Sequence, residues 1–290
     1  MDWTIFAQQI ALGFVNGIGY ALVAIGLTLI FGIMNVTNFA HGEFYMLGAF
    51  LVYTIITYLN LDYLPALAIT ALAVGSIGML CENLTIRPLR GRHELTLLLA
   101  TLGLSMILVD GAQLIWSPLP KRIPNRFEEL SLAIGPVILT YQRVFIALLG
   151  IALIIFIQQF LKRTTMGKLM RATAQNRDGA ALVGINIHWV HNFTFGFGCA
   201  LAAVSGALLG STTMIYPHIG QAMVIKAFVV VILAGMGSLP GAVVGGIVLG
   251  VVEAIAGGYI SVEYKDAFGY AMIIIILLLK PSGLFGGKRS

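Results

Sequence analysis

The sequence predicts an all-α protein, a polytopic transmembrane helical bundle of about eight to ten spans that forms one domain over residues 1–290. Hydrophobic residues make up 59% of the chain and charged residues only 10%, whereas a soluble domain carries about 25% charge. Glycine occurs 34 times, and membrane helices use glycine to approach one another closely. Nine apolar runs follow one another, and no polar stretch between them is long enough to form a separate core.

The nine runs are the candidate spans. The first is almost continuously apolar over 5–34, and a helix of that length covers ~45 Å, more than the ~30 Å hydrocarbon core. Its crossing is therefore expected to begin near Ile10. The other runs are 45–59, 64–82, 95–116, 144–161, 190–211, 223–236, 241–256 and 267–279. Several are short, so the expected number of crossings is a range.

Basic residues orient these spans. Eleven of the 17 Lys and Arg residues lie in three polar segments, 87–94, 162–188 and 280–290. Cytoplasmic loops carry an excess of such residues, so the three segments are expected in the cytoplasm, with the C-terminus. Three runs precede the first segment, which places the N-terminus outside. The net charge of +5 is explained by this membrane pattern, and nucleic acid is not an expected partner.

Two polar or glycine-rich interruptions separate apolar runs, at 32–43 and 235–241. Paired broken helices, here expected near 35–43 and 237–241, are typical of a transport path, although two ordinary turns would read the same way. The residues assigned to the path by this hypothesis are Asn35, Asn38, His41, Glu43, Gly237, Gly241 and Glu253. Glu43 and His41 could pair with each other or with freed backbone. Glu253 could instead pair with Lys226 or Lys265.

Repeated small-xxx-small spacing predicts close contacts between helices. The glycine pairs with this spacing are Gly13/Gly17, Gly206/Gly210, Gly241/Gly245 and Gly246/Gly250.

The sequence lacks the motifs that carry catalysis. There is no phosphate-binding loop, nucleophile triad or metal-ligand spacing, and the two cysteines lie in apolar runs. We expect no catalytic residue, no metal and no cofactor bound by this chain, which is therefore not expected to be an enzyme.

The segment 162–188 is long for a connector. It contains a possible short helix over 169–175 and a second helical stretch over 180–182. The second stretch is expected to end at Gly184, because glycine accepts the left-handed backbone of a helix end. Such a segment could dock another protein, or lie on the membrane surface alone.

Several motifs, in order along nearly the whole chain, resemble the permease of branched-chain amino acid ABC importers, the leucine/isoleucine/valine type. The first are Tyr-Ala-Leu-Val-Ala-Ile-Gly-Leu at 20–27, Phe-Gly-Ile-Met at 31–34, Asn-Phe-Ala-His-Gly-Glu at 38–43, Tyr-Met-Leu-Gly-Ala at 45–49 and Arg-Pro-Leu-Arg at 87–90. The others are Thr-Met-Gly-Lys-Leu-Met-Arg-Ala at 165–172, Ala-Ala-Leu-Val-Gly-Ile at 180–185, Gly-Met-Gly-Ser-Leu-Pro-Gly-Ala at 235–242, Glu-Tyr-Lys-Asp at 263–266 and Pro-Ser-Gly-Leu-Phe-Gly at 281–286.

The resemblance implies a multi-pass permease in a bacterial inner (plasma) membrane that translocates branched-chain or related hydrophobic amino acids. It implies four kinds of partner: a second permease subunit, two cytoplasmic ATPase subunits that bind ATP and Mg²⁺, a periplasmic solute-binding protein, and membrane lipid. It also implies a coupling loop within 162–188. The ATPase-coupling residues matched to the family are Gly167, Arg171, Ala172, Ala180, Ala181, Gly184 and Ile185. In other importers a Glu begins this motif, where the present chain has Arg171.

Two alternatives remain open on the sequence alone. Relatives with this pattern can also carry urea or amides. A protein of another class, an ion- or proton-coupled secondary transporter, could use His41, Glu43 or Glu253 as relay groups. The long 162–188 segment favours the ABC permease, because a secondary transporter needs no docking site for an ATPase.

Overall fold

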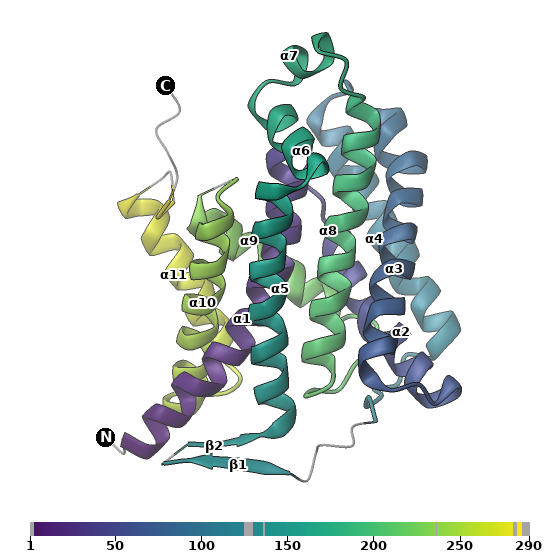
Figure 1. The fold of residues 1–290 in the computed structure, drawn as a ribbon. Helices are drawn as coiled ribbons and strands as arrows, with labels where there is room; N and C mark the ends of the chain where they lie inside the picture. Colours follow the sequence, from purple (N-terminus) through teal and green to yellow (C-terminus); the bar gives the residue numbers. More distant parts are fainter. Residues whose placement is uncertain (1–2, 125–129, 136, 236, 281–282, 286–290) are drawn as a thin grey trace.

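The computed structural model describes residues 3–124, 130–135, 137–235, 237–280 and 283–285, and within them the chain is an almost entirely helical bundle (Figure 1). Residues 281, 282 and 286–290, which include half of the predicted 281–286 motif and most of the last basic segment, lie outside the described residues. The long helices are α1 (Trp3–Met34), α2 (His41–Leu59), α3 (Tyr63–Cys81), α4 (Glu94–Trp116), α5 (Tyr141–Arg163), α8 (Ile187–Gly210), α9 (Ile219–Ala234), α10 (Leu239–Tyr259) and α11 (Lys265–Leu279). The short elements are a π-helix (Glu82–Ile86), a 3-10 helix (Arg87–Leu89), β1 (Ser131–Ile134), β2 (Val137–Thr140), α6 (Thr165–Gln175) and α7 (Arg177–Leu182).

Each of the nine predicted runs coincides with one of the long helices. Seven helices in the described part of the chain are long and apolar enough to cross a membrane. The other two, α9 with 16 residues and α11 with 15, span only ~24 Å and ~22 Å, less than the hydrocarbon core. The polytopic helical bundle is confirmed, and the lower span count follows from these two short helices.

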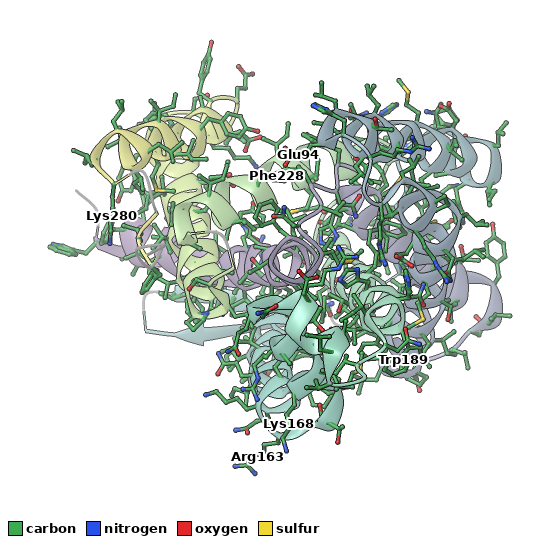
Figure 2. All side chains as sticks on the ribbon, turned by 90° about the horizontal axis from the view of Figure 1, so that it is seen from above. Glu94, Arg163, Lys168, Trp189, Phe228 and Lys280 are labelled. Atoms are coloured by element: carbon green, nitrogen blue, oxygen red, sulfur yellow. The ribbon has the colours of Figure 1, made fainter. Side chains whose placement is uncertain are left out.

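The described parts of the three basic segments lie at one end of the bundle, where α6 and α7 lie (Figure 1). The first two segments meet where the Arg90 Nη1 lies 3.4 Å from the His188 Nδ1. The chain after α11 hydrogen-bonds to the last turn of α9. Viewed from this end, Arg163, Lys168 and Lys280 lie along the outer edge (Figure 2). We call it the basic end. The chain start and the β1–β2 hairpin lie at the opposite end, the hairpin end.

Glycines permit a close crossing of helices α1 and α10. A Cβ atom on Gly13 or Gly17 would stand 2.6 Å from the backbone of α10, at Val251 and Ile247 respectively. A Cβ on Gly246 would stand 2.6 Å from the Ala21 nitrogen. Two of the predicted glycine pairs, Gly13/Gly17 and Gly246/Gly250, therefore face each other across one interface and let the backbones touch.

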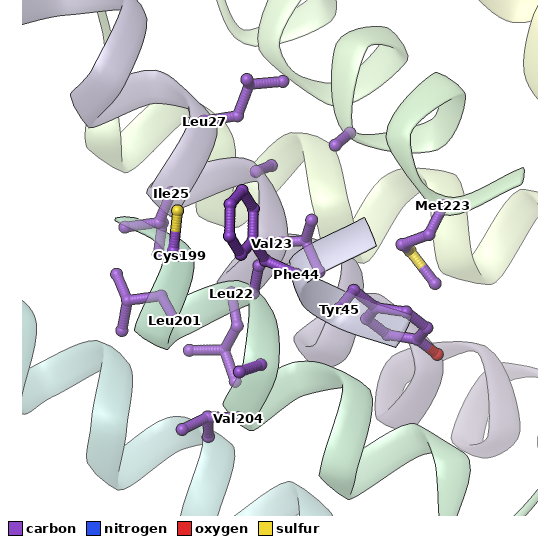
Figure 3. Packing of buried hydrophobic residues seen from close by; sticks show 14 of the residues in the cluster. Leu22, Val23, Ile25, Leu27, Phe44, Tyr45, Cys199, Leu201, Val204 and Met223 are labelled. Carbon is purple, nitrogen blue, oxygen red and sulfur yellow. The ribbon is translucent and has the colours of Figure 1, made fainter. Parts of the chain in front are cut away.

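The core forms where α1, α2, α8 and α9 meet. Phe44 of α2 lies at its centre and packs edge-on against Phe195, with ring centroids 6.1 Å apart (Figure 3). Cys199 lies in the same core as a free, fully buried thiol, as expected from its apolar surroundings. The core thus fixes α2 against α1 and α8, which is the part of the bundle that carries the first interruption.

The β1–β2 hairpin lies between the predicted apolar runs 95–116 and 144–161 and was not predicted. Its antiparallel strands pair Ser131 with Thr140 and Ile134 with Val137. Gln8 of α1 donates to the Ile138 carbonyl at 2.7 Å and accepts from the Ile138 N–H at 2.8 Å. The hairpin therefore anchors the first turns of α1, the part of this long helix expected to lie outside the hydrocarbon.

Candidate functional site

The connector between α5 and α8 consists of two short helices, each begun by a side-chain cap. Thr164 accepts from the Gly167 N–H at 3.0 Å at the start of α6, and Asn176 accepts from the Gly179 N–H at 2.8 Å at the start of α7. Asn186 caps α8 in the same way. Such caps satisfy the free N–H groups of a first helical turn, so these polar residues divide the connector. The two predicted short helices are present, as 165–175 and 177–182.

Gly167 allows α6 to fold back onto the end of α5. A Cβ atom there would lie 2.5 Å from the Leu161 Cα and 2.6 Å from the Phe160 carbonyl oxygen. The contact fixes the angle between α5 and α6. Gly167 is therefore buried in the joint of the connector, whereas Arg171, one turn further along α6, is exposed.

The end of α7 presents an apolar corner away from the bundle. Gly184 has φ +85°, and its N–H donates to the Ala181 carbonyl at 3.0 Å, which confirms the predicted helix end. Ala180 is buried, Ala172 and Ile185 are half-buried, and Ala181 is exposed. The sequence analysis missed the two side chains that follow Ala181: Leu182 is 89% exposed and Val183 78%. The sequence signal for this corner was the pair of bulky apolar residues that follows two alanines.

The two chain interruptions meet beneath α6. A Cβ atom on Gly32, at the end of α1, would lie 3.5 Å from the Gly237 Cα. Both interruptions contain left-handed backbone, at Asn35 (φ +53°) and Gly237 (φ +92°). A cavity of about 310 Å³ lies between them and α6; its lining residues are Thr28, Leu29, Gly32, Ile33, Leu161, Met170, Arg171, Ala174, Gly237 and Leu239. The connector thus lines one cavity together with residues of both broken segments.

Gly241 belongs to the second interruption through the cap of α10. Its N–H donates to the Ser238 hydroxyl at 3.1 Å, and a Cβ on it would lie 2.8 Å from the Ala234 carbonyl oxygen. The turn between α9 and α10 is therefore tight at this glycine, and a larger side chain would displace the ends of both helices.

The start of α2 holds three polar side chains that are fully buried, Asn38, His41 and Glu43. The imidazole Nε2 of His41 lies 3.1 Å from the Val23 carbonyl of α1, and Glu43 accepts from the Ser105 hydroxyl of α4 at 2.9 Å. His41 and Glu43 therefore find partners on two different helices. The Glu43 Oε2 atom has no hydrogen-bond partner among the described residues, which is unusual for a buried carboxylate oxygen.

Glu253 forms the predicted pair with Lys226, not with Lys265. The Lys226 Nζ lies 2.6 Å from the Glu253 Oε2, 2.8 Å from the Asp266 Oδ1 and 3.3 Å from the Tyr20 hydroxyl. Tyr20 donates to the same Glu253 oxygen at 2.8 Å. The network joins α1, α9, α10 and α11, and the sequence analysis missed Tyr20 and Asp266 because nothing in the spacing aligns them.

The described residues contain no group of three or more His, Cys, Asp or Glu side chains that could hold a metal ion.

Comparison with known proteins gives a consistent result. The family model for the branched-chain amino acid transport system permease component matches residues 9–277. The chain is 35% identical to the high-affinity branched-chain amino acid transport system permease protein BraD of Pseudomonas aeruginosa, over 97% of this chain and 96% of that protein. It is 36% identical, with the same coverage, to the corresponding protein LivH of Escherichia coli K12.

A solved structure shows the same fold. The chain aligns with the PsaBC complex of Streptococcus pneumoniae bound to a Fab at a TM-score of 0.53 and 13% identity, over 96% of this chain and 92% of the other. The apolar helices and the bacterial permease relatives confirm the predicted multi-pass location in the inner membrane. By the family match and by its near full-length identity to BraD and LivH, the chain belongs to the branched-chain amino acid transport system permease family.

Proposed function

We propose that this chain is the membrane-spanning permease subunit of an ABC importer that moves branched-chain or related hydrophobic amino acids across the inner membrane. The carrying observation is the α6–α7 connector: it exposes an apolar corner at Ala181, Leu182 and Val183, and its helix α6 lines a cavity together with residues of both chain interruptions. The names of the relatives support the choice of solute.

In this proposal the basic end faces the cytoplasm, as the clustered Lys and Arg residues favour. The apolar corner of α7 binds in a groove on an ATPase subunit, in the manner of an apolar helix face in a hydrophobic groove. Two ATPase subunits bind ATP and Mg²⁺, so hydrolysis belongs to the partners and the chain itself is not an enzyme and binds no cofactor. Coupling requires a rigid connection between the docking helix and the spans. At Gly167, α6 packs closely enough on α5 to transmit movement.

The movement would pass from α6 to the two interruptions. Met170 and Arg171 of α6 line the same cavity as Gly32, at the end of α1, and Gly237, in the α9–α10 turn. A displacement of α6 would therefore shift both of these segments together. The end of α1 continues through residues 35–40 into the start of α2, where His41 and Glu43 are buried. We assign Asn35, Asn38, His41, Glu43, Gly237 and Gly241 to the region that opens and closes the path; Glu253 acts through its pair with Lys226.

The remaining partners follow from the same proposal. A second permease subunit completes the path, a periplasmic solute-binding protein delivers the amino acid at the hairpin end, and lipid surrounds the exposed apolar helices. The family match favours this assignment over a secondary transporter and over a urea or amide permease.

Copurification tests the assembly. The chain, purified from its native membrane in mild detergent, is expected to retain ATPase subunits and a second permease. Recovery of a homo-oligomer alone, active under an ion gradient without ATP, would contradict the proposal and favour the secondary transporter.

A further inference from the structure

The buried Lys226 network is asymmetric. The side chains of Lys226 and Glu253 are 7% and 5% exposed, whereas that of Asp266 is 39% exposed. Lys226 has three N–H donors, and the structure gives it three acceptors, on Glu253, Asp266 and Tyr20. If its bond to Asp266 opened, Lys226 would keep a charged partner in the interior, and Asp266 could be solvated. If its bond to Glu253 opened, a buried carboxylate would lose its countercharge.

Helix α11, which carries Asp266, packs on the outside of the bundle. In the described structure Gly269 is its only fully buried residue, and a Cβ there would lie 2.7 Å from Leu249 and 3.4 Å from the Glu253 Oε1. Along its middle, the half-buried side chains of Tyr270, Met272 and Ile273 pack against the core. Near its far end, Leu284 and Phe285 donate backbone hydrogen bonds of 2.8 Å and 3.0 Å to the last residues of α9. The first turn of α11, at the hairpin end, is tied to the network by the Lys226–Asp266 pair.

We propose that Lys226 and Asp266 form a latch: Lys226 remains paired with Glu253 throughout, while its bond to Asp266 opens in each transport cycle and releases the start of α11 at the hairpin end. The inference rests on the proposed function and extends it by assigning Lys226 as a positioning residue for a moving helix. The anchor at 284–285 is the pivot. The exposed Asp266 carboxylate makes the opening possible without an unpaired charge in the interior.

The structure offers a direct covalent test. A Cβ atom built on Gly257 of α10 lies 3.7 Å from the Lys265 Cβ of α11, within the 3.5–4.5 Å range of disulfides. The double variant Gly257→Cys/Lys265→Cys, in a background with Cys81 and Cys199 replaced by alanine, places a reversible bond across the latch. As control, Gly75→Cys/Ala200→Cys joins α3 to α8, where the corresponding separation is 3.3 Å, far from α11 (Figure 1).

Two readouts separate the latch from the proposed function. First, the disulfide at 257/265 is expected to form several-fold more slowly when Asp266→Asn is added, while the 75/200 disulfide forms at an unchanged rate; equal rates would overturn the latch. This measurement needs no transport. Second, oxidation of the 257/265 pair is expected to lower ATP-driven leucine uptake at least tenfold, with recovery on reduction.

Full uptake by the oxidised 257/265 protein would show that α11 does not move, and would reject the gating part while leaving the importer assignment intact. Loss of uptake in the oxidised 75/200 control would also contradict the proposal, because the effect would then not be particular to α11. Absence of leucine uptake in every reduced variant would count against the proposed function, whereas the disulfide rates would still decide the latch.

Discussion

The apolar corner of α7 predicts the effect of one charge at Ala181. In the chain alone Ala181 is exposed, so Ala181→Glu should change the stability of the permease by no more than about 0.5 kcal/mol, as is usual for surface positions. In an ATPase groove the same carboxylate would be buried without a partner, which costs about 2–5 kcal/mol. At 1.4 kcal/mol per tenfold change, binding of the ATPase should weaken roughly 30-fold to 4,000-fold.

The assay is copurification of the ATPase with the permease, followed by uptake into vesicles. Membrane abundance of Ala181→Glu should match that of the parent, with ATPase binding and uptake lost. Gln175→Glu is the matched control, because Gln175 is exposed on the neighbouring α6 and the charge change is the same. Normal ATPase binding by Ala181→Glu, or equal loss in the control, would refute the assignment of this corner as the coupling contact.

Three further predictions concern the rest of the bundle. Lys226→Met should sharply lower membrane abundance, because breaking a buried ion pair costs about 3–5 kcal/mol. The double variant Lys226→Met/Glu253→Met should recover much of the lost abundance. No recovery would mean that the two charges do not act as a pair. Gly241→Leu should lower uptake more than abundance because its Cβ meets the Ala234 carbonyl in the α9–α10 turn, while Gly103→Leu, where nothing lies within 4 Å, should be neutral; normal uptake by Gly241→Leu would reject a role for this tight turn. Single cysteines at Lys168 and Pro124 should be labelled from the cytoplasm and from outside respectively, and labelling of position 124 from inside would reverse the orientation.

Hydropathy and charge were sufficient to predict the architecture. All nine apolar runs became helices, and the three basic segments, as far as they are described, lie at one end. These features depend on the chemistry of single segments in a bilayer, so they can be read from each run separately. The glycine pairs of α1 and α10 were visible in the same way, but which helix each would contact was not.

Contacts between segments that are distant in the sequence could not be predicted from it. Glu82 lies five residues before Arg87, but its carboxylate pairs with Arg90 and accepts a hydrogen bond from the Asn192 side chain of α8 at 3.0 Å. A π-helix over Glu82–Ile86 changes the spacing at this point, and nothing in the sequence announced it. Likewise, the meeting of Gly32 with Gly237 depends on how α1 and α10 cross, and the pairing of Lys226 with Asp266 depends on where α11 returns to the bundle.

We propose that this chain imports branched-chain amino acids with energy from partner ATPases, and uptake by the purified complex measures that activity itself. The experiment follows leucine uptake into proteoliposomes that contain the purified complex, with the solute-binding protein outside and ATP sealed inside. We expect accumulation that requires internal ATP, continues when ion gradients are collapsed, and is lost with Ala181→Glu but not with Gln175→Glu. Uptake that needs an ion gradient and does not depend on ATP would refute the proposal.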